Sequence, residues 1–322
     1  MYEEQELRRR QARRREQLRR QKLRRKVRIC VSLVVIAVVL VAAANFISGL
    51  GGIRETGFGE LLAKIAGANR DDGAVSVSYV DADKADLVYP QVRDEDEVLR
   101  QLKTLAKEKD AYTEIVENYD DYPEELLAAL CNNEEMLPFV QGYLKADGQA
   151  RGGLTKEEKE VDIPLLLQWD ERWGYVPYGE SNIALSGCAP TCLSMVIVSL
   201  TGDSTATPDA IAAYAMENGF YLEGTGTAWA IMTDGVAHYG VKGTELSLDE
   251  SVVKKHLEAG EPIICSMRPG DFTTGGHFIV LTSVVDGKIT VHDPNSRKRS
   301  SVLWDYDTLA SQIKNLWAFT EN

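Results

Sequence analysis

The chain has 322 residues, enough for one sizeable hydrophobic core with accessory segments, and a formal net charge of −13. A chain this acidic offers no large basic surface for phosphates, which excludes nucleic acid as a partner. Its five cysteines are odd in number and irregularly spaced, so they form no disulfide framework. With only four scattered histidines beside them, the sequence predicts neither a metal nor a cofactor.

Charge and hydropathy divide the N-terminal part into segments. Residues 1–28 hold 13 Lys and Arg against four Asp and Glu, which predicts a basic cytoplasmic tail. Residues 29–47 carry no charge and are long enough for a transmembrane helix with the basic block on its cytoplasmic side. We therefore expect a single-pass cell-membrane protein whose remaining residues are extracytoplasmic. A cleaved signal peptide, cut near residues 42–44, is the alternative.

The next segments differ in composition. Residues 48–92 are rich in Gly, Ala, Ser and Asp, which predicts a flexible stalk with a short strand near 75–80. Residues 93–147 form an acidic helical module, because apolar side chains recur there at helical spacing. A packing collar or spacer is favoured over a binding role for this module. Residues 148–160 are a linker.

Residues 161–322 are expected to fold as one compact α+β domain. Four helices are predicted, each followed closely by glycine, at 189–201, 208–218, 227–239 and 249–258. Strands are predicted at 262–267, 277–285, 288–293 and 315–319, with a short helix near 306–313. A helical half followed by an antiparallel sheet half fits two lobes with a cleft between them.

Cys188 stands where a glycine-containing turn enters an apolar helix. A helix N-terminus offers unpaired N–H donors and the positive end of the dipole, which favour a thiolate. Cys192 lies one turn further along the same helix, without a glycine approach, and is expected to be a packing residue. A small buried hydrophobe is the alternative for Cys188 as well.

His277 differs from the other histidines. It follows Thr273-Thr274-Gly275-Gly276 and begins an apolar strand, so it is a candidate general base at a groove. The alternative is a strand-end histidine bonded to a backbone carbonyl. His256 lies among charged residues on a helix, and His238 ends a helix, which indicates solvation for the first and capping or packing for the second.

Asp293 closes the strand that follows, and the turn decides which face it takes. A two-residue turn at Asp286-Gly287 would place Asp293 opposite Val280, away from His277. A three-residue loop at 285–287 would place it opposite Ile279, on the face of His277. The hypothesis that Asp293 orients His277 therefore requires this loop or another bulge.

Gln168 stands near the start of the domain. Its neutral amide could donate to a developing oxyanion without changing the charge of the site. A surface glutamine is the alternative.

The order of Gln168, the run from Gly187 to Thr191, the run from Gly275 to His277, and His292-Asp293-Pro294 resembles cysteine peptidase family 39 and its relatives. These are papain-like enzymes related to the double-glycine leader peptidases of bacteriocin exporters. The likeness implies a papain-like α+β fold, with Cys188 as nucleophile, His277 as base, Asp293 as orienting acid and Gln168 as oxyanion donor. The helical module similarly resembles a segment preceding such domains in membrane-anchored relatives from Gram-positive bacteria.

Two features depart from this family. Ala189 stands where these enzymes usually have glycine, and no P-loop is present, so the chain is not an exporter subunit. The expected topology also exports the domain, which argues against a cytoplasmic leader-peptide substrate. The sequence thus predicts an extracytoplasmic cysteine peptidase acting on peptides or proteins. The alternatives are an amidase or endopeptidase acting on peptidoglycan stem peptides and a catalytically inactive peptide-binding module.

Overall fold

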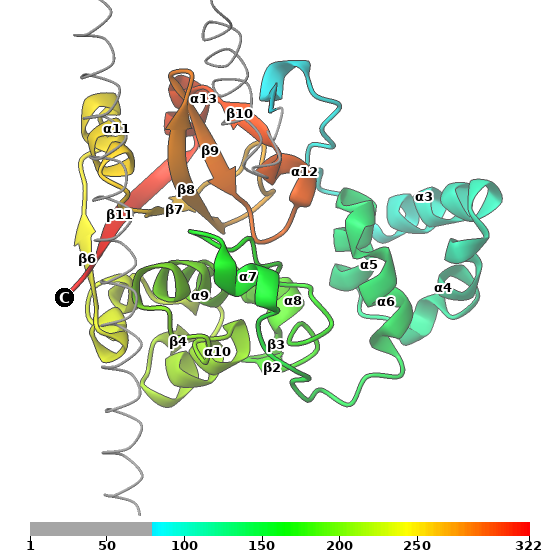
Figure 1. Cartoon of the computed structure of the whole chain (residues 1–322). Helices are drawn as coiled ribbons and strands as arrows, with labels where there is room; N and C mark the ends of the chain where they lie inside the picture. The colour runs from blue at the N-terminus through cyan, green and yellow to red at the C-terminus, as the bar shows by residue number, and fades with distance from the viewer. Residues whose placement is uncertain (1–78) are drawn as a thin grey trace, which may run out of the picture. The chain divides into compact units, whose positions relative to one another are not determined.

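The computed structural model describes residues 79–322 (Figure 1). The predicted tail, the predicted transmembrane helix and residues 48–78 of the predicted stalk lie outside this range. Within residues 79–322, no helix combines the length and the apolar character needed to cross a bilayer.

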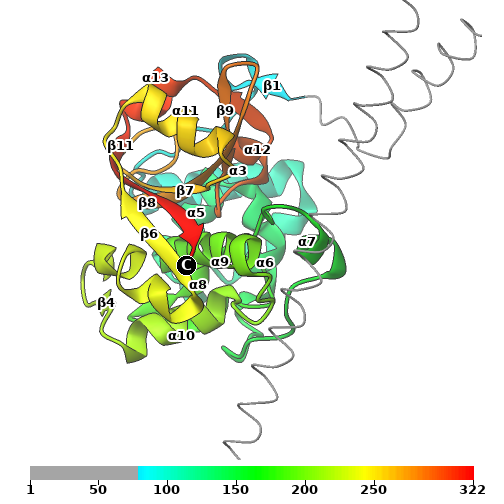
Figure 2. The ribbon, with the colours of Figure 1, turned by 60° about the vertical axis from the view of Figure 1, so that its left-hand side comes forward.

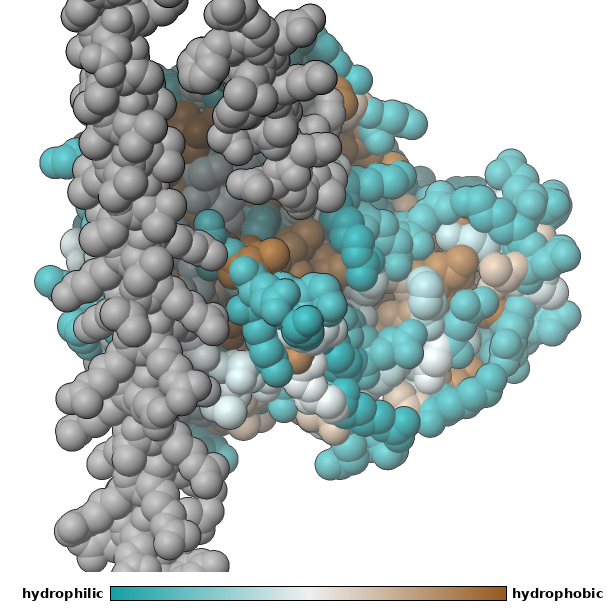
Figure 3. Space-filling model, viewed as in Figure 1, coloured by the Kyte–Doolittle hydropathy of each residue, from teal (hydrophilic) through white to brown (hydrophobic). Residues whose placement is uncertain are grey.

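The predicted helices of the module are present. They are α3 (Glu95–Glu108), α4 (Thr113–Glu117), α5 (Glu124–Asn132) and α6 (Leu137–Tyr143), joined by the 3-10 turns η2 (Asp110–Tyr112), η3 (Tyr119–Asp121) and η4 (Glu134–Met136). Asp94 begins α3 through a capping box with Glu97, which satisfies free N–H groups of the first turn. Hydrophilic residues cover much of the visible face of the module (Figure 3). Its buried side chains share one hydrophobic cluster with Leu167, Trp169 and Ala184, so the module packs directly onto the following domain.

The two segments flanking the module are more ordered than expected. The flexible stalk is wrong for residues 80–84. There β1 (Val80–Asp81), which overlaps the end of the short strand expected near 75–80, pairs in parallel with β10 (Val302–Trp304) and is followed by η1 (Ala82–Lys84). The linker also contains a short helix, α7 (Lys156–Glu160), whose first turn is fixed by a capping box from Thr155 to Glu158.

Helices dominate the first half of the C-terminal domain, as predicted. This lobe holds α8 (Ile183–Ser186), α9 (Cys188–Thr201), α10 (Pro208–Glu217) and the two-stranded pairs β2 (Pro177–Tyr178) with β3 (Ser181–Asn182) and β4 (Tyr221–Leu222) with β5 (Gly226–Thr227). The long helix predicted at 227–239 is wrong. The chain forms two 3-10 turns there, η5 (Trp229–Met232) and η6 (Gly235–Tyr239), and the break at Thr233 directs the apolar side chains of both turns into the core.

A mainly antiparallel sheet forms the second half of the domain (Figure 1). Its strands are β6 (Val241–Glu245), β7 (Ile263–Met267), β8 (His277–Val285), β9 (Lys288–His292), β10 and β11 (Ile313–Glu321), in the order β1-β10-β9-β8-β7-β11-β6. The remaining helices are α11 (Glu250–Glu258), α12 (Arg297–Ser300) and α13 (Tyr306–Ala310). The α+β class is confirmed, while β6, β10 and α12 are absent from the sequence prediction.

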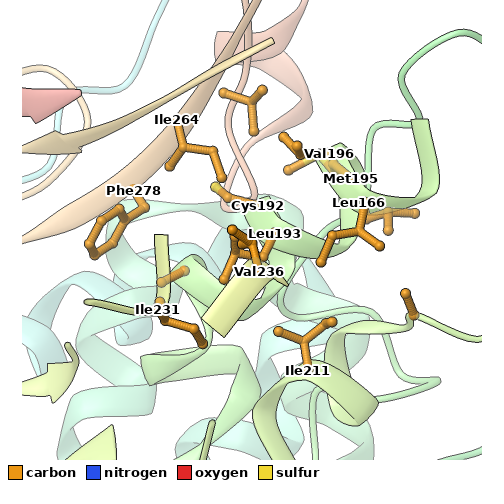
Figure 4. Packing of buried hydrophobic residues seen from close by; sticks show 14 of the residues in the cluster. Leu166, Cys192, Leu193, Met195, Val196, Ile211, Ile231, Val236, Ile264 and Phe278 are labelled. Atoms are coloured by element: carbon orange, nitrogen blue, oxygen red, sulfur yellow. The ribbon is translucent and has the colours of Figure 1, made fainter. Parts of the chain in front are cut away.

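Each face of the sheet has its own core. On one face, α9 packs its apolar side chains, including Cys192 and Val196, against Ile264 and Phe278 of the sheet (Figure 4). On the other face, α11 and α13 cover a second cluster, and α11 stands beside the sheet in the turned view (Figure 2). Helix α9 is almost entirely buried, as expected for a helix that is apolar on all sides.

Candidate active site

Cys188 is the first residue of α9 and is partly exposed. The turn before it is tight, because Gly187 N–H donates to Ile183 C=O at 2.8 Å. A Cβ on Gly187 would lie 2.6 Å from that same oxygen, so only glycine fits between α8 and α9. Thr191 then bonds the Gly187 carbonyl through both its backbone N–H and its hydroxyl. The sulfur is thus held at a helix N-terminus, where the dipole favours negative charge.

His277 and Asp293 are brought together. The His277 Nε2 atom lies 2.7 Å from Asp293 Oδ1, and both residues are buried. A carboxylate can only accept a hydrogen bond, so Nε2 carries the proton. The other ring nitrogen, Nδ1, then remains for the Cys188 thiol, which lines the same cavity and favours the protonated ring.

The register that produces this contact differs from the predicted one. The three-residue loop at 285–287 is wrong, because Val285 pairs directly with Lys288 across a two-residue turn with positive φ at Asp286 and Gly287. A β-bulge between Leu281 and Ser283 shifts the pairing by one residue, so that His292 lies opposite Val280. Asp293 consequently follows on the same face as His277.

Electrostatics couple the two side chains. Burial by itself would lower the pKa of His277, but the charge and hydrogen bond of Asp293, together with the nearby Cys188, outweigh it and raise this pKa to about 9. Burial would raise the pKa of Asp293, yet the positive charges of Arg299 and His277 lower it to about 2. Both shifts favour an imidazolium beside a carboxylate, so His277 readily holds a proton that it takes from Cys188.

Arg299 is a member of the site that sequence reasoning missed. It is 3% exposed, and its Nε donates to Asp293 Oδ2 at 2.5 Å. Asp293 Oδ1 also accepts from the backbone N–H of Asn295 at 2.8 Å. Both carboxylate oxygens are therefore occupied. In sequence, Arg299 follows two other basic residues and carries no signal that distinguishes it from a solvent-exposed turn.

Gln168 lines the same cavity as Cys188 and His277. Its Nε2 donates to Ala184 C=O at 2.6 Å, and its backbone N–H donates to Pro294 C=O at 2.7 Å. An amide nitrogen has two hydrogens, so one N–H remains for a ligand. Gln168 is buried, so it is not a surface glutamine.

The other cysteines and histidines are unsuited to the chemistry. Burial raises the pKa of Cys192 and of Cys265, which keeps both as thiols. Burial also lowers the pKa of His292 to about 4, so it stays neutral beside Asp293. His256 contacts Glu261, and His238 stacks on Tyr214. Within residues 79–322, no cluster of His, Cys, Asp or Glu could hold a metal ion.

A cavity of about 1430 Å³ opens over Cys188. One wall comes from residues 90–93 and from α5, through Glu125, Ala128, Ala129 and Asn132. Other lining residues come from the segment 221–229 and from Lys314, and residues 272–278 add the glycine pair that precedes His277. The helical module is therefore part of the cavity wall, which adds to the role of packing collar or spacer favoured from the sequence.

The site combines a thiol at a helix N-terminus, an imidazole oriented by a buried carboxylate, and a free amide N–H in one groove. This set can activate a sulfur nucleophile and stabilise an oxyanion. The chain belongs to the Peptidase_C39 like family, which residues 160–322 match. Membership points to a cysteine peptidase that acts on peptides or proteins. Among curated proteins, no match to this chain was found.

Proposed function

We propose that this protein is a membrane-anchored, extracytoplasmic cysteine peptidase of papain-like fold that hydrolyses peptide bonds through Cys188, His277 and Asp293. The observation that carries the proposal is the hydrogen bond of His277 to the buried Asp293 at 2.7 Å, in the cavity that Cys188 also lines. The division into a helical lobe and a sheet lobe, with Cys188 on the first and His277 on the second, supports the papain-like fold.

In the first half of the reaction, His277 Nδ1 takes the thiol proton and the Cys188 thiolate attacks the peptide carbonyl carbon. The carbonyl oxygen becomes an oxyanion, which accepts hydrogen bonds from Gln168 Nε2 and from the backbone N–H of Cys188. When the tetrahedral species collapses, the C–N bond breaks and His277 gives its proton to the leaving amine. A thioester on Cys188 remains.

In the second half, His277 removes a proton from water, and the resulting hydroxide attacks the thioester carbonyl. The C–S bond breaks, the carboxylic acid product leaves, and the sulfur regains its proton from His277. Asp293 keeps the ring in the same tautomer and orientation through both halves, because its carboxylate accepts from Nε2 throughout.

An extended polypeptide is the substrate that the groove supports best. Its volume of about 1430 Å³ exceeds the roughly 300–1,000 Å³ of pockets that enclose small molecules. Exposed apolar side chains line the groove from two parts of the chain, Val92 before the module and Leu222 and Trp229 in the helical lobe. Side chains on either side of the scissile bond would contact them.

The uncharged stretch 29–47 and the basic block before it support the anchor and its orientation. In intact cells treated with an impermeant protease, residues 79–322 are then expected to be digested while an N-terminal tag is protected. Protection of both parts would contradict the orientation, and release of the untreated protein into the medium would favour a cleaved signal peptide.

The activity is tested with the purified full chain and a library of peptide substrates, together with a thiol-reactive active-site probe. Cys188→Ala is expected to lose both hydrolysis and labelling, and His277→Ala to lose hydrolysis and most labelling. Cys192→Ala is the matched control, since it removes a thiol from the same helix and is expected to keep both.

Other outcomes separate the alternatives. Release of soluble muropeptides by the wild type but not by Cys188→Ala, without cleavage of peptides, would identify a peptidoglycan hydrolase. Peptide binding with no turnover and no probe adduct on Cys188 would identify a binding module, and would overturn the proposal.

A further inference from the structure

The helical module contacts the loop that carries Asp293, not only the groove. The carboxylate of Glu135 in η4 accepts a hydrogen bond from Ser296 Oγ at 2.7 Å. It also accepts from the first backbone N–H groups of α12, those of Arg297 at 3.0 Å and Lys298 at 3.2 Å. Asn133 next to it donates its side-chain amide to Asn295 C=O. Four hydrogen bonds to Asn133 and Glu135 of the module thus fix residues 295–298.

Helix α12 in turn fixes Arg299. Ser296 Oγ accepts from the Arg299 backbone N–H at 3.2 Å, and Trp304 Nε1 donates to the Arg299 carbonyl at 3.1 Å. With its backbone fixed at both ends, the Arg299 side chain reaches Asp293 Oδ2. The guanidinium Nη2 is buried and has no hydrogen-bond partner among the described residues. The main polar interaction of the buried Arg299 guanidinium is therefore its contact with Asp293.

We propose that Arg299 is a positioning residue that fixes Asp293 against His277, and that Glu135 of the helical module holds the helix carrying Arg299. This inference rests on the proposed peptidase function. Without Arg299, His277 and the Asn295 N–H bind only Oδ1 of the carboxylate, which could then rotate, whereas a carboxylate bound on both oxygens keeps a single plane. Removal of Arg299 or Glu135 would then misplace the imidazole without touching substrate.

The groups that face Asp293 define the expected pH response. They are His277 from β8, Arg299 from α12 and the thiol of Cys192 from α9. The charge of Arg299 is the largest single cause that lowers the pKa of Asp293. Without its charge, Asp293 takes up a proton at higher pH, and a neutral acid no longer stabilises the imidazolium.

The test measures kcat and KM against pH for the full chain with one cleavable peptide. We expect Arg299→Gln and Glu135→Gln to lower kcat at least tenfold with KM little changed. In Arg299→Gln the acidic limb of the profile should also move to higher pH. Arg299→Lys keeps the charge. We expect its acidic limb to stay at the wild-type pH, while its kcat remains below that of the wild type. Glu134→Gln is the matched control, because the neighbouring Glu134 bonds Lys109 and Tyr112 within the module.

An unchanged acidic limb in Arg299→Gln, or an equal loss of kcat in Glu134→Gln and Glu135→Gln, would overturn the inference. If Arg299→Gln does not fold, Arg299→Lys and Glu135→Gln still decide it through kcat. Cys188→Ala separates the two proposals. Hydrolysis that survives in Cys188→Ala refutes the peptidase mechanism, whereas hydrolysis that is lost there but normal in Glu135→Gln refutes only the positioning role.

Discussion

His277 and Asp293 face each other because a bulge in β8 absorbs one extra residue between His277 and the turn. Val285 pairs with Lys288 at the turn, but Leu281 pairs with Val291 further along, so Thr282 and Ser283 share one partner, Thr290. The bulge lets the apolar residues of both strands face the same core while placing the acid beside the base. The orientation of His277 toward Asp293 thus depends on how β8 absorbs an extra residue five positions further along the strand.

Deletion of Thr282 tests this account. The deleted strand can pair regularly, with Leu281 still opposite Val291, so His277 and Asp293 should remain aligned and kcat should stay close to wild type. The hydrogen bonds of Thr282 to Thr290 are lost, which should lower the free energy of unfolding by about 1 kcal/mol. Enzyme assays and urea denaturation check both values. Loss of activity in a folded, correctly paired variant would show that the bulge itself positions the site.

The bulge could be predicted from the spacing of apolar residues within β8, but not from the turn. The apolar residues that face the second core are Ile279, Leu281 and Val284, a spacing of two and then three. A regular strand keeps a period of two, so the change in spacing marks the extra residue. Asp286-Gly287 is itself a typical two-residue hairpin turn, and it forms one here.

Cys188 and His277 could be predicted because each stands beside a local pattern, a glycine turn entering an apolar helix and a glycine pair entering an apolar strand. Arg299 could not, because its burial depends on α12 folding back onto Asp293 and on Glu135, far away in the chain. The α+β class followed from periodicity. The packing of the module against the domain depends on contacts between distant segments, which periodicity does not encode.

Gly187→Ala should misplace the nucleophile. The new Cβ would lie 2.5 Å from Ile183 Cγ2 and 2.6 Å from Ile183 O, so the α8–α9 turn must open. Overpacking of this kind costs about 1–3 kcal/mol of stability, and we expect a larger fractional loss of kcat than of folded protein. Thermal unfolding measures the stability of the variant, and labelling with the thiol-reactive probe measures the reactivity of Cys188. Gly153→Ala, where a Cβ meets nothing within 4 Å, is the control. Normal labelling of Gly187→Ala would contradict the argument.

Gln168→Ala should impair turnover rather than abolish it. Loss of one oxyanion donor typically costs about 3 kcal/mol of transition-state stabilisation, so turnover should slow by a factor of roughly 100 to 1,000. KM should change little, because the amide acts on charge that develops only in the transition state. Steady-state kinetics on the folded variant measure the changes in kcat and KM separately. An increase in KM with unchanged kcat would instead make Gln168 a substrate-binding residue.

The His277–Asp293 pair should stabilise the fold over a defined pH window. The pKa of His277 is raised from 6.5 to about 9, so its contribution is complete below pH 6.5 and is lost as pH rises through 9. The pKa of Asp293 is lowered from 3.8 to about 2, so its contribution is present above pH 3.8 and is lost as pH falls through 2. The free energy of unfolding of wild type relative to His277→Gln should therefore decline between pH 6.5 and 9. A constant difference across that range would contradict the ion pair.

Trp229 is expected to bind substrate without taking part in the chemistry. Its ring is 38% exposed in the groove, packs edge-on against Trp317 with centroids 5.4 Å apart, and lies 5.2 Å from Lys314 Nζ. A rigid, half-exposed indole offers a large apolar contact at low entropic cost, and loss of such an anchor often exceeds 1 kcal/mol. Trp229→Ala should therefore raise KM about tenfold for peptides with an apolar side chain at the position that contacts it, and leave kcat near wild type. Leu248→Ala, an exposed apolar residue that does not line this groove, is the control. A fall in kcat at unchanged KM would instead mean that Trp229 supports the lobe through Trp317.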